Sequence, residues 1–375
     1  SAGTEPKVTF RKKRAPEGKV RGGLVVLLVV IAGGTGLVVN ASRRPELRVA
    51  GRRFVEVSRY APGHQLAERL AFLDGGKLLV ATCPRYLRVV LARITDAHEV
   101  EEIKDIDVEG RSVAIAAGKD RFTVLVRPHG DARHLEEAWW QSFDLAGAPI
   151  GSRIRVGWDP DDFAFSEDGA LAYVLTSGSA EGETNRPLPA LIVFDVTDGT
   201  PRPIGRVVFD RPKDDPERLI LLPGGRAAVS LRGSNEIARL DVSDPKSPGI
   251  VDRVAVPDEG VPLALAVGGD GRLLVGDPDA SAFWRLDGDR LVRVDVDGGV
   301  AELIEAEGFT FATLPRGSGV AVFAGRSDSP VGKLSIRGAA NLGNTRPLGI
   351  AHSPERKLLA VSNRAGGSLH LIAIE

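Results

Sequence analysis

Hydrophobic residues in this chain fall in short runs that are paired around tight turns. The clearest pair spans Phe163 to Thr176, where two apolar runs flank Glu167-Asp168-Gly169. Glycine adopts the positive φ that a hairpin turn requires, and an acidic residue before it tolerates the turn geometry. A lone two-stranded hairpin cannot bury both of its faces. The stretch therefore predicts a hairpin that belongs to a larger β-structure.

The same unit recurs along the chain at intervals of roughly 38 to 55 residues, which is the length of a β-propeller blade. The further copies are 70–82, 113–126, 219–231, 264–277, 311–324 and 349–363, with turns at 74–76, 118–120, 223–225, 269–271, 316–318 and 353–355. The pattern predicts an all-β, seven-bladed propeller over residues 48–375. An eight-bladed propeller, or an open sandwich over part of the chain, is the alternative.

The two ends of this domain each lack a partner. A strand around Phe54 has no hairpin partner of its own, and only one strand, Ser368 to Ile374, follows the last hairpin. A blade needs four strands, so the simplest closure pairs the Phe54 strand with the C-terminal one. This pairing removes an open sheet edge.

An uncharged apolar run precedes the propeller. It is about 18 residues long, close to the ~20 that a membrane helix needs, and it is apolar on all sides. We predict a basic cytoplasmic tail over 1–21, a transmembrane helix over 22–41 and a linker over 42–47. The anchor residues are Leu24, Val25, Val26, Leu27, Leu28, Val29, Val30 and Ile31. A cleaved signal peptide ending near Val39-Asn40-Ala41 is the alternative.

Charge indicates how the anchor is oriented. The tail is basic, and its cluster Arg11, Lys12, Lys13 and Arg14 is suited to lipid headgroups or a partner subunit. The weaker Arg43-Arg44 pair follows the run, which favours a cytoplasmic N-terminus and a periplasmic propeller at a bacterial inner membrane. The formal net charge of the whole chain is −1, so no global basic field suggests nucleic acid.

One segment of the fourth blade has a recognisable repeat. Ile237 to Pro257, with Leu240-Asp-Val-Ser-Asp-Pro at its centre, resembles the LVIVD repeat of bacterial surface propellers, and Leu191 to Val207 is similar. The hairpin units also resemble those of YVTN-type and lactonase-like seven-bladed propellers. The resemblance implies a propeller fold and an exported location. It implies no single activity, because propellers host many unrelated functions.

No residue pattern of catalysis or cofactor binding stands out. The one cysteine, Cys83, is predicted to be a small buried residue. His129 and His134 alone are close in sequence, and a solvated loop explains them better than a metal site. Asp287-Gly-Asp289 and Asp295-Val-Asp297 lack a complete calcium loop and are predicted to be turns.

An acidic stretch at a blade junction can line the central channel. It contains Asp159, Asp161 and Asp162, at the start of the third blade. Lactonase-like propellers hold calcium there with a Glu, Asn and Asp set, which cannot be matched residue by residue in this chain. We predict no enzyme activity and no cofactor; a calcium-dependent lactonase-like hydrolase acting at the channel is the alternative.

Trp139 and Trp140 form the candidate interface. Adjacent strand residues point to opposite faces, which predicts one buried and one exposed indole unless a partner covers it. An exposed Trp would be a typical interface anchor, but packing between blades is the favoured interpretation.

These observations predict a non-enzymatic, membrane-anchored scaffold or accessory subunit of a larger inner-membrane complex, with respiratory and photosynthetic assemblies as candidate hosts. Its predicted partners are membrane lipid, other integral membrane subunits and a protein on one propeller face. A cell-envelope ligand-binding module is a further alternative.

Overall fold

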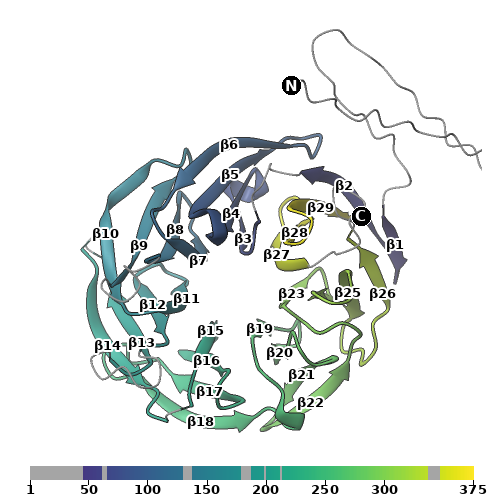
Figure 1. Ribbon diagram of the computed structural model, residues 1–375. Helices are drawn as coiled ribbons and strands as arrows, with labels where there is room; N and C mark the ends of the chain where they lie inside the picture. The colour runs from purple at the N-terminus through teal and green to yellow at the C-terminus, as the bar shows by residue number, and fades with distance from the viewer. Residues whose placement is uncertain are drawn as a thin grey trace, which may run out of the picture. The chain divides into compact units, whose positions relative to one another are not determined.

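The computed structural model describes residues 45–60, 66–129, 137–178, 187–197, 200–211, 213–336 and 347–375. In the unit from Arg44 to Glu375, seven antiparallel sheets are arranged around a central channel (Figure 1). Each sheet is one blade, and its first strand lies innermost. The seven inner strands contact one another in a closed cycle. The prediction of an all-β, seven-bladed propeller is confirmed.

Blades one to three contain four strands each. Blade one has β3 (Leu70–Leu73), β4 (Leu78–Cys83), β5 (Arg88–Ile94) and β6 (Val100–Asp107), with 3-10 turns η1 (Asp74–Gly76) and η2 (Pro84–Tyr86) between its first three strands. Blade two has β7 (Arg111–Ala117), β8 (Arg121–Arg127), β9 (Ala138–Asp144) and β10 (Pro149–Gly157). Blade three has β11 (Pro160–Phe165), β12 (Leu171–Thr176), β13 (Ala190–Asp195) and β14 (Arg202–Val208).

Blades four to six have the same plan. Blade four has β15 (Pro216–Leu222), β16 (Arg226–Leu231), β17 (Glu236–Asp241) and β18 (Gly249–Ala255), followed by η4 (Pro257–Glu259). Blade five has β19 (Ala264–Val267), β20 (Leu273–Gly276), β21 (Ala282–Asp287) and β22 (Arg290–Asp295). Blade six has β23 (Glu302–Ala306), β24 (Phe309–Leu314), β25 (Gly319–Ala324) and β26 (Gly332–Ser335).

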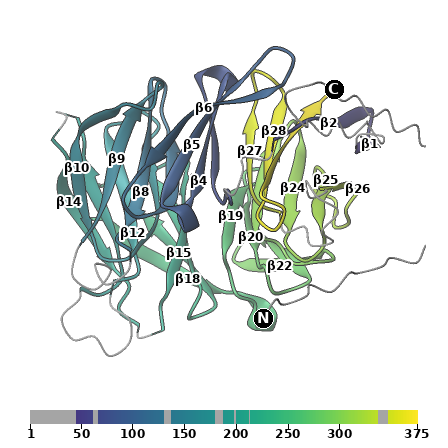
Figure 2. The same cartoon turned by 45° about the horizontal axis from the view of Figure 1, so that its top comes forward.

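Blade seven joins the two ends of the described chain, as predicted. It contains β27 (Pro347–Ser353), β28 (Leu358–Asn363) and β29 (Ser368–Ile374), and β29 pairs with β2 (Arg52–Tyr60), placing Phe54 opposite Ile374. Figure 2 shows the purple β2 beside the yellow C-terminal strands. Phe54 is fully buried against Phe309 of blade six, with ring centroids 5.3 Å apart. Hydrophobic packing between blades thus secures the closure.

The N-terminal strand differs from the prediction in one respect. It does have a hairpin partner, β1 (Glu46–Val49), which makes blade seven five-stranded. Ala50 and Gly51 both have positive φ, 47° and 77°, as a two-residue hairpin turn of the primed type requires. The expected linker over 42–47 therefore already contains strand residues.

In blade six, the hairpin predicted from the sequence is not the innermost one. The predicted hairpin around 316–318 joins β24 to β25, the second and third strands, whereas the inner strand is β23. The turn between β23 and β24 is formed by Glu307 and Gly308, with φ of 55° and 81°. Glu302 and Glu305 therefore lie on the inner strand next to the channel.

Trp139 and Trp140 point to opposite faces of blade two, as expected, but both are buried. Trp139 is 8% exposed and packs with Phe122 and Phe143 between blades one and two, whereas Trp140 is 3% exposed and packs with Phe194 between blades two and three. Neither indole is exposed, because a neighbouring blade covers each face, so packing between blades, the favoured interpretation, accounts for both residues. Neither indole offers an exposed anchor.

The predicted anchor residues 24–31 and the basic cluster 11–14 lie outside the described residues. Among the residues that are described, no helix is both long and apolar enough to span a membrane.

Candidate functional site at the channel mouth

The seven inner strands all begin at one mouth of the channel, and this mouth holds a cavity of about 530 Å³. Every blade contributes to its lining, through residues at or just before the first strand: Arg69, Arg111, Asp161, Arg218, Leu263, Glu302 and Leu348. A second cavity of about 180 Å³ shares Arg69 and Glu302 with the first and is also lined by Asp162. Arg69 and Glu302 therefore lie at the boundary between the two cavities.

Four inner strands carry a β-bulge at this mouth. The pairing registers shift at Val113 in β7, Asp161 in β11, Glu217 in β15, and Leu348 and Gly349 in β27. Val113, Asp161, Glu217 and Leu348 all line the cavity. A bulge sets two residues opposite one on the neighbouring strand and re-aims a side chain. The bulges thus direct side chains into the channel that strict alternation would place elsewhere.

Buried hydroxyl groups hold the inner strands near the mouth. The Thr82 hydroxyl accepts a hydrogen bond from the Arg69 backbone N–H at 3.0 Å, and the Thr313 hydroxyl donates to the Leu348 carbonyl at 2.8 Å. Ser362 accepts from the Gly349 backbone N–H at 2.8 Å. All three hydroxyl residues are fully buried at the ends of second strands. Their bonds fix the backbone from which channel side chains project.

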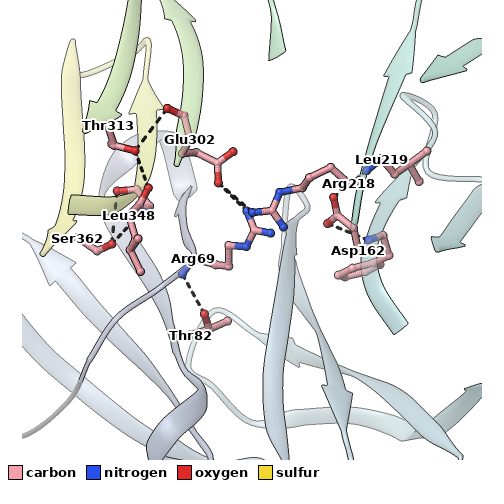
Figure 3. Close-up of polar contacts among 11 residues, drawn as sticks. Arg69, Thr82, Asp162, Arg218, Leu219, Glu302, Thr313, Leu348 and Ser362 are labelled. Atoms are coloured by element: carbon pink, nitrogen blue, oxygen red, sulfur yellow. Dashed lines mark hydrogen bonds and ion pairs between the residues drawn. The ribbon is translucent and has the colours of Figure 1, made fainter. Parts of the chain in front are cut away.

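A three-residue ion bridge crosses the channel (Figure 3). Glu302 Oε2 accepts a hydrogen bond from Arg69 Nη1 at 2.6 Å and another from Arg218 Nη2 at 3.5 Å. These residues come from blades six, one and four. Burial raises the pKa of Glu302, and the Arg69 guanidinium acts in the opposite direction. The bridge forms the floor of the mouth cavity.

Asp162 is held below the mouth by backbone donors. Its Oδ2 accepts from the Leu219 N–H and its Oδ1 from its neighbour Phe163, both at 3.0 Å. Burial raises the pKa of Asp162 to about 6, although the nearby Arg69 charge lowers it. The pKa of Asp162 therefore lies closer to neutral pH than that of an ordinary aspartate.

Asp161 lies in the mouth cavity beside a cation. Arg127 Nη2 donates to its Oδ1 at 2.5 Å, and the Ser177 hydroxyl donates to its Oδ2. Burial nevertheless raises the pKa of Asp161 to about 7, against the Arg127 charge. Asp161 is therefore partly protonated near neutral pH.

Arginines outnumber carboxylates around the mouth cavity. Six arginines line it, namely Arg69, Arg85, Arg111, Arg127, Arg218 and Arg364, against the four carboxylates Glu68, Asp161, Glu217 and Glu302. All four carboxylates have an arginine partner. Arg85 and Arg111 are exposed at the mouth and make no ion pair or side-chain hydrogen bond within the described part of the chain. The lining of the cavity therefore has a formal excess of two positive charges when all four carboxylates are ionised.

The sequence predicted part of this site. The expectation that the Asp159 to Asp162 stretch lines one mouth is confirmed for Asp161, whereas Asp162 lines the second cavity. Glu302 was missed because β23 was not assigned as an inner strand. A local signal could have located the channel residues. Proline suits the first residue of a strand, and at Pro160-Asp-Asp and Pro216-Glu-Arg it is followed directly by two residues that line the channel.

The other residues considered for chemistry lie away from this cavity. Cys83 is fully buried, and burial raises the pKa of its thiol to about 12, as suits an inert residue. Asp289 pairs with Arg239, and Asp295 pairs with Arg293, both next to turns of blade five. His134 lies outside the described residues. Within the described ranges, no group of three or more His, Cys, Asp and Glu side chains is arranged to hold a metal ion.

Comparison with known proteins supports the fold alone. No family model matches the chain, and no curated protein matches it. Among solved structures 1265 chains match, and one, described as a streptogramin B lyase structure, aligns with a TM-score of 0.65 and 9% sequence identity, covering 86% of this chain and 98% of that one. At 9% identity, the structural similarity shows a shared propeller fold and gives no evidence about activity. The resemblance to the LVIVD repeat stays a prediction.

Proposed function

We propose that the propeller is a binding module whose ligand is an anion held in the mouth cavity. The observation that carries this proposal is the pair of exposed arginines, Arg85 and Arg111, that face the cavity with no acidic partner among the described residues. Guanidinium groups bind carboxylate and phosphate through two parallel hydrogen bonds. A cleft lined by charges of one sign also concentrates the oppositely charged ligand.

The pairing of the other charges supports binding. Arg127 is neutralised by Asp159 and Asp161, and Arg364 by Glu68. Arg111 lies directly opposite Arg127 in the β7–β8 ladder. Because Arg127 already has two carboxylate partners, Arg111 is the cation of this pair that has no counterion among the described residues, and a bound anion would supply one.

Membrane attachment stays part of the proposal. The uncharged run over 22–41 would anchor the propeller at a bacterial inner membrane, with the N-terminus cytoplasmic and the propeller periplasmic. As an accessory subunit of a larger complex, the propeller would then present its mouth to an anionic ligand or to an acidic group on a partner. Co-purification of stable subunits with the anchored chain is the observation that would support this placement.

The binding proposal is tested by calorimetric titration of the full chain with acetate, succinate, citrate, phosphate and sulfate at low ionic strength. We expect at least one of these anions to bind and the double substitution Arg85→Gln and Arg111→Gln to weaken it at least tenfold. Arg290→Gln, which removes an exposed arginine on the outer strand β22, is the matched control and should have no effect. Failure of all five anions to bind the wild-type chain would exclude the proposal.

A hydrolase or lyase acting in the same cavity is the second candidate. Asp161 favours it, because a buried carboxyl whose pKa is raised to about 7 suits a general acid or base. The solved neighbour named as a lyase is consistent with this class but shows only the shared fold. Turnover of a lactone panel, measured with and without calcium and repeated with Asp161→Asn, discriminates catalysis from binding.

A further inference from the structure

Two sets of incompletely bonded arginines lie at different depths of the mouth cavity. The rim set is Arg85, in the turn η2, and Arg111, at the start of β7, and both are exposed. The floor set is Arg218, whose side chain is only 14% exposed and which lies in the bridge to Glu302 (Figure 3). One cavity thus offers cationic donors both at its opening and at its base.

Arg218 has more donors than the bridge uses. A guanidinium carries five N–H groups, yet among the described residues the one side-chain hydrogen bond of Arg218 is the 3.5 Å bond to Glu302 Oε2. The same oxygen accepts the shorter 2.6 Å bond from Arg69. Arg218 Nε is buried and has no hydrogen-bond partner in the part of the chain that the structure describes. A buried donor without a partner is unfavourable, so an acceptor placed there would be stabilised.

The walls of the cavity include apolar surface. Val113, Leu263, Ala301 and Leu348, from four different blades, line it together with the arginines. Such a lining disfavours a ligand that is charged along its whole length. It suits a hydrocarbon spacer between two charged ends.

We propose, building on the proposed function, that the ligand carries two carboxylates joined by a short aliphatic spacer. One carboxylate binds Arg218 at the floor, and the other binds Arg85 and Arg111 at the rim. The planar carboxylate matches the guanidinium fork at both positions. Arg218 is thereby the specificity-determining residue, since a monocarboxylate can bind Arg85 and Arg111 at the rim without contacting Arg218.

The test compares malonate, succinate, glutarate and adipate with the monoamide of each, titrated into the full chain. We expect one chain length to bind best and to exceed its own monoamide at least tenfold. In Arg218→Gln the diacid should bind no better than its monoamide, while the monoamide keeps its wild-type affinity. Arg218→Lys retains the charge without the fork and should give an intermediate loss; Arg290→Gln should change nothing.

The remaining outcomes distinguish the two-carboxylate ligand from the more general proposal of anion binding. If diacid and monoamide bind equally well to the wild type, and binding still depends on Arg111, the two-carboxylate ligand is excluded and the anion-binding function stands. If no anion binds, both proposals fail. Tighter binding of pyrophosphate than of every diacid would overturn the assignment to carboxylates.

Discussion

Asp161 is the residue at which pH should act on the mouth cavity. Its pKa is raised from an ordinary value near 3.8 to about 7 by burial, so the carboxyl loses its proton around neutrality. Because the folded pKa lies above the unfolded one, the folded state binds more protons between about pH 4 and 7, and the Asp161 contribution to stability falls as pH rises through that window. Protonation also removes one negative charge from a cavity proposed to bind anions.

We therefore expect anion affinity to increase as pH falls from 8 to 6, by about three- to tenfold for a neighbouring unit charge. The substitution Asp161→Asn should give the high-affinity behaviour at both pH values. Asp120→Asn, in the exposed turn at the opposite end of β7, is the control and should keep the wild-type pH dependence. Titrations at a series of pH values measure this, and an affinity that is constant across the series would refute the role given to Asp161.

At the scale of elements, the closure of blade seven depends on buried polar contacts as well as on apolar packing. His370 in β29 is fully buried, with Nδ1 3.3 Å from Glu56 Oε1 in β2 and Nε2 2.9 Å from the Ser368 hydroxyl. Arg59 donates to both oxygens of Glu56, at 2.8 and 3.1 Å. The first and last strands of the ring are thereby joined by a charged network as well as by their ladder.

This network predicts an acid-sensitive closure. Burial alone would raise the pKa of Glu56, but the hydrogen bonds from His370 and Arg59 outweigh it, and the pKa lies below its usual 4.5. The stabilisation is therefore present above pH 4.5 and is lost as pH falls through the lower folded value. Glu56→Gln should reduce the free energy of unfolding at pH 7 by about 2 kcal/mol and flatten its decline in acid.

Hydrogen exchange localises the effect to the two strands involved. We expect β2 and β29 to exchange faster in Glu56→Gln than in the wild type, with blades two to four unchanged. Glu101→Gln, on the exposed outer strand β6, should leave exchange and stability as they are. Equal protection of β2 and β29 in both proteins would show that the ladder and the apolar contacts close the ring without help from Glu56.

The sequence was informative about elements wherever one local signal determined them. Turn residues between short apolar runs located the inner hairpins of six blades, and the Phe54 strand, for which the sequence showed no hairpin partner, identified the closure. The prediction of the inner hairpin failed in blade six because this blade has two candidate turns, at 307–308 and 316–318, and the second resembles the turns of the other hairpins more closely. The bulges could not be predicted, since a period of two places Asp161 and Asp162 on opposite faces.

At the scale of the whole molecule, the channel bridge joins residues that no local pattern relates. Arg69 and Arg218 are separated from Glu302 by 233 and 84 positions, yet all three meet across the ring. Only the closure of seven blades brings them together. This is why the sequence could indicate an acidic stretch at the mouth but could not identify the arginines that surround it.

The bridge predicts opposite effects of one substitution on stability and on binding. In Glu302→Gln two largely buried arginines lose their shared counterion, so we expect the free energy of unfolding to fall by about 3 kcal/mol or more. The same change leaves Arg69 and Arg218 both unpaired at the floor, so a diacid such as succinate should bind about tenfold more tightly. Binding to the folded state should then restore about 2.7 kcal/mol when the free ligand reaches 100 times its Kd.

Thermal unfolding of Glu302→Gln in a succinate series measures both effects. The Tm should lie below that of the wild type without ligand and should rise more steeply with succinate concentration. Glu101→Gln should follow the wild type throughout. If Glu302→Gln is destabilised but succinate raises its Tm no more than that of the wild type, Arg69 and Arg218 only brace the ring, and the anion is bound by the rim arginines alone.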